Sequence, residues 1–389
     1  MIHYDDDATL DRIYDAGTDD WYMETALLCS NSINTGDRLD MAHREDTIVS
    51  CKTTQTLFGN NNPTIGGAVA ATMTGQVIED ANLHNPTAGD AVWAVTRFLS
   101  TTDSSLFTAW HWDKPFIVDK VEREFTGTEW LNTFTATDAM HRADVAYMRI
   151  TGRHYWTSDA GPNPTAAELV RDIASLLGLA GITTDTATRL TAQEAAAGLG
   201  TLTAPAEETT CRELLCYVAA WLGGNFIIKP SGYSYGALHL VPLTYGATVA
   251  NVAYNSASSR LGGASPTSDT WDVLLTSEEG EAYAGTPGSL RLEAPCPWVS
   301  SPAHALAPLA VVQGSQAWAY NGFTLRDAIA DIRIEVGDWI EWSYPAAESV
   351  VFGVATMVGS ITRTFDHAGL ATLSAPDPAP YTSDTHGIT

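Results

Sequence analysis

Two Thr-x-x-Glu segments near the middle of the chain constrain its fold most, because each marks the start of a helix. Thr165 precedes Glu168, Thr210 precedes Glu213, and apolar residues at helical spacing follow both pairs. In such a capping box the threonine hydroxyl accepts from the amide three residues on, and the glutamate reaches back to the threonine amide. The two predicted helices then meet glycines that suit helix ends, at Gly178 and Gly223.

Strand patterns surround these helices. Apolar and polar residues alternate over 69–77, and the run 47–57 is rich in β-branched residues. Both features are typical of half-buried strands. Further strand candidates lie at 115–118, 130–137, 225–229, 237–243, 332–336, 340–342, 350–365 and 370–373. Many short strands separated by turns favour a barrel or sandwich, so we expect a β-rich α+β fold.

The order of these patterns predicts three parts, because 389 residues are too many for one ordinary core. Residues 1–150 form a β-rich block with an N-terminal leader. Residues 151–265 form an α/β unit and a linker, since Ala, Ser, Gly and Asn dominate 246–270. Residues 266–389 form a second β-rich block with a short C-terminal tail.

The net charge is −26, from 46 acidic and 20 basic residues. A surface this acidic repels phosphate, which argues against tight nucleic-acid binding. It suits a channel through which DNA slides without sticking, although solubility or an acidic host proteome explains the charge too. If there is a channel, we expect its lining to be mainly acidic or neutral.

The sequence carries no sign of a membrane or secreted protein. No run of about 18 apolar residues occurs, and the N-terminus lacks a signal-peptide pattern. The cysteines are odd in number and form no C-x-x-C pair, which favours reduced, small buried residues. They are Cys29, Cys51, Cys211, Cys216 and Cys296. We expect the chain to be made and folded in a cytoplasm.

We predict no catalytic, cofactor-binding or metal-binding residue, because no zincin, serine-hydrolase, P-loop or dinucleotide-binding motif occurs. His111, between two tryptophans, is more typical of a strand edge than of a binding site. Cys211 and Cys216 are five apart, so they do not share a helix face for metal binding. Three aspartates at 5–7 lack the calcium-loop pattern that would follow them, and a solvated leader explains them better.

Two features leave other chemistry open. The pairs Glu207-Glu208 and Glu278-Glu279 are acid–base candidates, although chance pairs are expected among so many acids. Five tryptophans form either a sugar-binding platform or half-buried sheet residues at an interface. These are Trp271, Trp298, Trp318, Trp339 and Trp342.

Five features, in order along residues 22–375, resemble signatures of the hub proteins at the distal end of bacteriophage tails. The closest is Thr210–Ala219 followed by Gly223–Phe226, which is similar to the hub pattern T-x-R-E-x-L-x-Y-(I/V)-A-x-x-x-G-G. The others are Thr64–Val69, Lys114–Asp119, Phe134–Met140, and the pair Tyr320–Phe323 with Ile334–Ile340. The chain departs from the family at Pro115-Phe116, where a glycine is usual, and at Gly322, where a proline is usual.

This resemblance implies two tube-like antiparallel β-barrels, at 1–150 and 266–389, with the α/β unit between them. It implies a homotrimer whose six barrels match a six-fold tail tube. The implied partners are the distal tail protein and tail tube proteins, the tape-measure protein, and central tip or fibre proteins. DNA would pass through without specific binding, and no stable membrane insertion is expected. The location would be the distal end of the virion tail, after assembly in the host cytoplasm.

We expect no enzymatic activity. Many relatives carry a C-terminal peptidoglycan peptidase, and this chain ends soon after the expected second barrel, as a short form without that domain. Two alternatives stay open: a peripheral receptor- or carbohydrate-binding virion protein, favoured by the tryptophans, and a carboxylate-dependent hydrolase. The spike-carrying hub of a contractile injection machine shares the same architecture.

Overall fold

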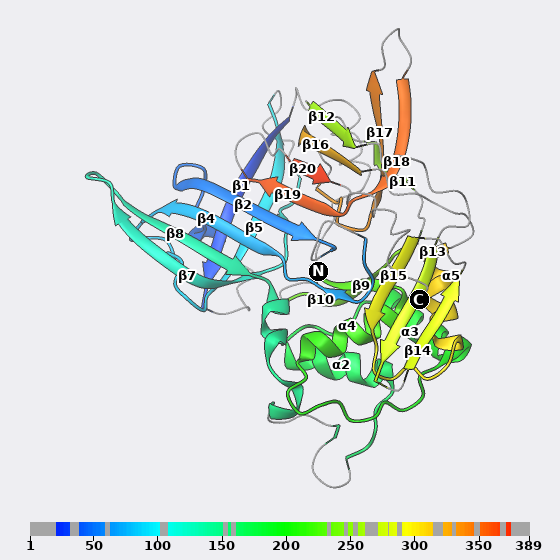
Figure 1. Ribbon diagram of the computed structural model, residues 1–389. Coiled ribbons are helices and arrows are strands. Elements are labelled where there is room, and N and C mark those ends of the chain that lie inside the picture. Colours follow the sequence, from blue (N-terminus) through cyan, green and yellow to red (C-terminus); the bar gives the residue numbers. More distant parts are fainter. Residues whose placement is uncertain are drawn as a thin grey trace.

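Strands from both flanks of the sequence pair in one large sheet in the computed structural model (Figure 1). The structure describes residues 21–31, 39–58, 63–101, 108–150, 155–156, 161–231, 235–244, 248–251, 256–260, 271–278, 280–285, 290–313, 322–328, 332–345, 351–365 and 371–374. The N-terminal strands of this sheet are β1 Trp21–Ser30, β2 Ile48–Thr56, β4 Thr72–Ile78, β5 Ala91–Ser100, β6 His111–Trp112, β7 Phe116–Phe125 and β8 Trp130–Thr137. Its C-terminal strands are β12 Ser256–Arg260, β16 Gly322–Ala328, β19 Ser360–Thr364 and β20 Ala371–Ser374. They run in the order β1, β5, β7, β8, β4, β2, β19, β20, β16, β12, with β6 beside β5.

The two halves of this sheet meet where β2 pairs antiparallel with β19. There Lys52 lies opposite Thr364, and the hydroxyl oxygens of Thr54 and Thr362 are 3.2 Å apart. The predicted β-rich α+β class is therefore confirmed. The ends of the sheet, β1 and β12, do not pair with each other within the described residues, so no closed barrel is seen there.

Alternation of side chains builds the core under the N-terminal half of the sheet. In β4, Met73 and Val77 are buried while Thr72 and Thr74 are exposed, which is the pattern of a strand with one solvated face. Phe134 of β8 lies on the same buried side, with its ring so close to Gly75 that an added Cβ would lie 2.4 Å from it.

The central helices are α2 Ala166–Leu176, α3 Thr184–Ala197 and α4 Cys211–Leu222. They pack beside a small sheet of β10 Ala237–Pro242, β9 Gly224–Lys229 and β3 Gly67–Ala68. Both predicted capping boxes are present, at Thr165 and Thr210. Gly223 ends α4 with φ +69°, a conformation that favours glycine. The two predicted helices are thus confirmed, whereas α3, which lacks a capping glutamate, was not predicted.

Residues 271–313, which we placed in the second β-rich block, pack instead on the unit formed by α2, α3, α4 and the sheet of β10, β9 and β3, which we name the helical unit. β13 Trp271–Ser277, β14 Gly280–Gly285 and β15 Leu290–Pro295 form a separate sheet, and α5 Ala303–Gln313 covers it (Figure 1). Both α5 and β15 also contact α4. The helix α5 was not predicted from the sequence, because Pro308 inside it is a strong helix breaker.

Two other segments differ from the sequence prediction. The expected linker 246–270 contains β11 Thr248–Asn251 as well as β12, which pairs with β16 at the end of the large sheet. Backbone pairing at a sheet edge needs no apolar periodicity, so composition gave no sign of it. The expected strand at 332–336 is a turn segment that leads into β17 Trp339–Pro345. β17 pairs with β11 and β18 Val351–Met357 in a third small sheet.

The hydrophobic core joins distant parts of the sequence. One cluster of buried residues includes Leu57 from the N-terminal half, the apolar faces of α2 and α4, and Ile361 and Leu373 from the C-terminal strands. No helix in the described part of the chain has the length and apolar character needed to cross a bilayer.

A junction between the large sheet and the helical unit

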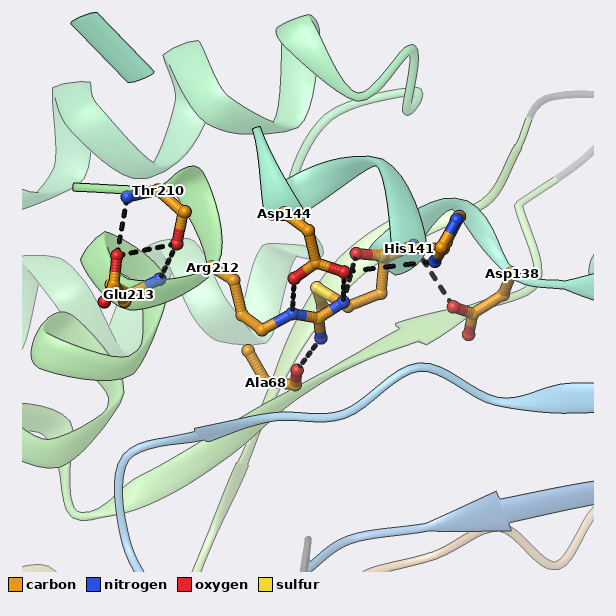
Figure 2. A network of polar contacts seen from close by, with 8 residues as sticks. Ala68, Asp138, His141, Asp144, Thr210, Arg212 and Glu213 are labelled. Carbon is orange, nitrogen blue, oxygen red and sulfur yellow. Dashed lines mark hydrogen bonds and ion pairs between the residues drawn. The ribbon is translucent and has the colours of Figure 1, made fainter. Parts of the chain in front are cut away.

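Arg212, near the start of α4, joins three segments of the chain (Figure 2). Its Nε and one terminal nitrogen donate to the two carboxylate oxygens of Asp144, at 2.5 and 3.0 Å. It also donates to the carbonyl of Met140, at 2.8 Å, and to the carbonyl of Ala68. Asp144 and Met140 lie in the 3-10 helix η3 Ala139–Asp144, and Ala68 ends β3. A guanidinium can serve several acceptors in fixed directions, so this one side chain sets the position of α4 against both.

The Arg212 guanidinium also holds the pKa of Asp144 below its usual range, chiefly through its hydrogen bond. The carboxylate is half exposed, with 53 % of its side chain accessible, while Arg212 is 24 % exposed. Solvent therefore weakens the ionic part of this contact. The backbone carbonyls that Arg212 caps are the larger reason to expect it to stabilise the junction.

A buried ion pair lies at the start of η3. Lys114 Nζ is 3.2 Å from Asp138 Oδ2, and the two side chains are only 3 % and 1 % exposed. The same ammonium donates to the carbonyl of Ile228 in β9, at 2.9 Å. Asp138 caps η3 by accepting from the Met140 amide at 3.1 Å. The pair therefore connects the start of β7, the end of β8 and the central strand of the helical unit.

Asn225 makes the third connection, from inside β9. It is fully buried; its Oδ1 accepts from the Gly67 amide at 2.6 Å and its Nδ2 donates to the Thr64 carbonyl at 2.8 Å. A Cβ added at Gly67 would lie 2.7 Å from that Oδ1, so only glycine fits there. Both polar atoms of this buried amide are thus satisfied by the segment 64–67, which leads through β3 of the small sheet to β4 of the large sheet.

The C-terminal part of the chain reaches the same strand. Lys229, at the end of β9, forms an ion pair of 2.7 Å with Glu335. Gly337 follows with φ +91°, and its amide donates to the Val358 carbonyl at 2.8 Å. An added Cβ at Gly337 would meet Val241 of β10 at 2.2 Å, so this turn packs tightly on the helical unit.

These contacts form one feature, which we name the junction. It comprises Thr64, Gly67, Ala68, Lys114, Asp138, Met140, Asp144, Arg212, Asn225, Lys229 and Glu335. Four of the quoted sequence motifs meet in it, and Ile334–Ile340 joins through Glu335. Tyr320 and Asn321 lie outside the described residues. Buried polar contacts hold many multipart proteins together, and nothing in this geometry resembles a nucleophile with its base. What the junction does is fix the orientation of the large sheet against the helical unit.

Most of these residues belong to the sequence motifs, although Asp144 and Lys229 do not, and no pattern in the sequence predicted that they meet. The sequence did contain a sign that some of these polar residues are buried and need partners. Lys114 is one of the chain's few lysines and stands next to an apolar run, and Asn225 interrupts the apolar start of β9. A lone polar residue in an apolar strand must find partners when buried.

The remaining candidates lie away from the junction, with one exception. His111 is half-buried in β6 and pairs with β5, which confirms the strand-edge interpretation. It lines a cavity of about 40 Å³ beside Lys114 and Arg363. Glu207, Glu208 and Glu278 are exposed, and Glu279 lies outside the described residues. The aspartates at 5–7 also lie outside them.

The cysteines and tryptophans are mostly core residues. None of the five cysteines is in a disulfide, and all are buried except Cys216, which is half-buried. Burial raises the pKa of Cys211 to about 12 and that of Cys216 to about 11, which leaves both thiols protonated at neutral pH. No group of His, Cys, Asp and Glu side chains in the described ranges is arranged to hold a metal ion. Trp271, Trp298 and Trp339 are buried, Trp318 lies outside the described residues, and Trp342 belongs to β17.

Comparison with known proteins gives matches by fold alone. No protein-family model matches the sequence, and no curated protein matches it. The tail protein from Neisseria meningitidis MC58 is similar over 92 % of this chain and 98 % of its own, with a TM-score of 0.50 and 10 % identity. The 43 kDa tail protein of prophage MuSo2 from Shewanella oneidensis is similar over 90 % and 96 %, also with a TM-score of 0.50 and 10 % identity. A chain of the lidded Francisella PdpA-VgrG complex matches less closely, with a TM-score of 0.43, 7 % identity, and coverage of 98 % of this chain and 56 % of its own.

Proposed function

We propose that this chain is the structural hub of a phage tail tip or baseplate, which joins the six-fold tail tube to a three-fold tip. The observation that carries the proposal is the likeness of nearly the whole chain to nearly the whole of two tail proteins. The ordered motifs that meet in the junction support it independently. A hub must transmit the position of the tube to the tip, and a fixed orientation between sheet and helical unit serves that purpose.

The proposal includes a homotrimer that surrounds the DNA channel at the distal end of the tail. In it, the large open sheet of each chain would supply two tube-like units, one from its N-terminal strands, within residues 1–150, and one from its C-terminal strands β12, β16, β19 and β20. Three chains would then present six similar units to the tube. The partners would be the distal tail and tube proteins above, the tape-measure protein within, and central tip or fibre proteins below. Assembly would take place in the host cytoplasm.

The proposed role is assembly and passage of DNA, without bond chemistry. The carbohydrate-binding alternative loses support from the tryptophans, because three of the five are buried and offer no ring to a sugar. The hydrolase alternative rests on adjacent glutamates alone, and Glu207 and Glu208 are simply exposed. No observation favours either alternative over the hub.

Cryo-electron microscopy of the distal tail end, in particles that carry this chain, tests the proposal. The expected result is three copies around the tail axis, each with two β-sheet units beneath a six-fold tube. A position off the axis, or absence of the chain from the tail, would refute it.

A further inference from the structure

One face of the large sheet is made mostly of hydroxyl side chains, with Ile78 and Leu131 as an apolar pair at one end. It spans five adjacent strands, β8, β4, β2, β19 and β20, which lie side by side in Figure 1. We name it the threonine face, and it comprises Thr133, Thr135, Thr137, Thr72, Thr74, Gln76, Ser50, Lys52, Thr54, Thr362 and Thr372. At the usual strand spacing it is about 20 Å wide.

Strand register shows that these side chains form continuous rows. Thr137, Thr72 and Thr54 are opposite one another in turn, and Thr54 continues to Thr362 and Thr372. Gln76 donates to the Thr133 hydroxyl at 3.0 Å, which places both on the same face. Cross-strand threonine pairs stabilise a sheet, and threonine favours strands. These preferences account for the threonines of the face, but not for the absence of acidic side chains from its strands.

What is missing is negative charge. None of these five strands contains an aspartate or a glutamate, in a chain with 46 of them. Lys52 is the one charged side chain of the threonine face within these strands. Charges return at β7, the next strand along the sheet, with Asp119, Lys120 and Glu122. A solvated sheet face normally carries charges of both signs, so an acid-free patch crossing both halves of the chain calls for a reason beyond solubility.

The chemistry of the face excludes most occupants that would be held there. Stable protein interfaces use aromatic, methionine or arginine side chains near their centres, and this face has none. Proteins that hold single-stranded nucleic acid use stacking aromatics and a basic groove, which are absent too. The face offers hydroxyls that water can satisfy and no cluster of cations to retain phosphate. Its carboxylate is Asp119 at the β7 edge, which accepts from the Thr137 hydroxyl at 3.0 Å, and the five strands themselves supply none to repel phosphate.

We propose that the threonine face is the wall past which nucleic acid moves through the hub. This inference rests on the proposed function and makes it more specific, because it assigns the lining of the channel to strands from both ends of the chain. Of the acidic or neutral lining that the net charge predicts, it selects the neutral one, with Lys52 as the one charged side chain that its five strands contribute. A polyanion meets little attraction and little repulsion along such a wall, so it neither stalls nor is excluded.

Cysteine labelling tests the location of the face. Thr74→Cys places a thiol at its exposed centre, and the parent chain measures the background from Cys216. In the isolated chain the new thiol should react with both a small methanethiosulfonate and a 5 kDa polyethylene-glycol maleimide. In assembled, DNA-free tails it should keep the first reaction and lose the second, because a narrow passage admits only the small reagent. If both reagents react, the face is on the outside, and if neither reacts, another chain covers it; either result overturns the inference.

Charge substitution tests what the wall does. Thr74→Arg with Thr135→Arg adds two phosphate contacts per chain, which should slow genome ejection at 50 mM salt relative to 200 mM by about tenfold or more. The matched control is Thr188→Arg with Thr191→Arg, which adds the same charge at exposed positions of α3. Unchanged ejection, or slowing that salt does not relieve, would overturn the inference. Microscopy of the same particles shows separately whether the chain is at the tail axis. A wrong assignment of the channel wall can therefore be distinguished from a wrong assignment of the chain as a hub.

Discussion

The buried ion pair of the junction gives a sharp test of how the junction is held. Replacing Lys114 with methionine keeps its shape but leaves the Asp138 carboxylate buried without its cation, with only the Met140 amide still donating to it. The carbonyl of Ile228 also loses its donor. Breaking a buried pair in this way typically costs about 3–5 kcal/mol. Asp138→Asn keeps an acceptor for the Met140 amide but leaves the buried Lys114 ammonium without a carboxylate. We expect it to lower the free energy of unfolding by a similar amount.

The double variant should be more stable than either single one. Lys114→Met with Asp138→Asn buries no charge, and what remains is an unpaired carbonyl, worth about 1–3 kcal/mol. The two single losses would sum to about 6–10 kcal/mol if the residues acted separately. The difference is a coupling free energy of several kcal/mol, above the range usual for neighbours because both charges are almost fully buried.

Urea unfolding at pH 7, followed by tryptophan fluorescence and by far-ultraviolet circular dichroism, measures the cycle. Coincident transitions from the two probes allow the free energies to be compared. The matched control is Lys120→Met with Glu122→Gln, an ion pair on β7 whose side chains are 68 % and 66 % exposed. That pair should show no measurable coupling. Additive losses at Lys114 and Asp138 would refute the reasoning, because they would mean that the charges do not depend on each other.

Two further predictions concern other contacts of the junction, and a third concerns His239 of β10. Gly67→Ala should lower stability by about 2–4 kcal/mol, seen as a lower Tm, because its Cβ would overlap the Asn225 side chain; an unchanged Tm would contradict this. Arg212→Lys should cost about 1–2 kcal/mol in urea unfolding, since an ammonium cannot reach Asp144 and both carbonyls together, and a loss as small as at an ordinary surface site would count against it. Burial lowers the pKa of His239 to about 4, so the unfolded chain binds more protons between pH 6.5 and 4 and stability falls as pH drops through that window, by about 3 kcal/mol in full. His239→Gln should reduce this acid-induced loss in urea unfolding at pH 7 and pH 4.5, and an equal loss in both proteins would show that other groups cause it.

The parts of the fold that follow from local rules were predictable from the sequence. The capping boxes at Thr165 and Thr210 fix two helix starts within a few residues of chain, whatever surrounds them. The alternation in β4 likewise states which side chains are buried. The sequence did not predict α5, because a proline such as Pro308 is unfavourable inside a helix. Packing on β13, β14 and α4 stabilises this helix instead.

Long-range pairing was not predictable from one sequence. β2 and β19 are about 300 residues apart, and both are threonine-rich strands that would pair equally well with other partners. Their pairing is decided by the shared core beneath, where Leu57 and Ile361 meet residues of the helical unit. The junction was missed for the same reason: the sequence marks Lys114 as a residue that needs a partner, but only the folded chain brings Asp138 and Ile228 within hydrogen-bond distance of it.

The use of charge at the junction is also informative about function. An apolar replacement of a buried ion pair is often neutral or stabilising, so stability alone does not explain why Lys114 and Asp138 are charged. An ion pair with fixed acceptors allows fewer relative positions of two packed units than an apolar contact does, because each displaced polar atom would lose its partner inside the protein. In the proposed hub this restriction would matter more than added stability, since an error in the angle between sheet and helical unit would be repeated in every copy of the proposed ring. The double variant of Lys114 and Asp138 separates the two properties, because it should remain folded yet form regular tail tips less efficiently than the parent chain.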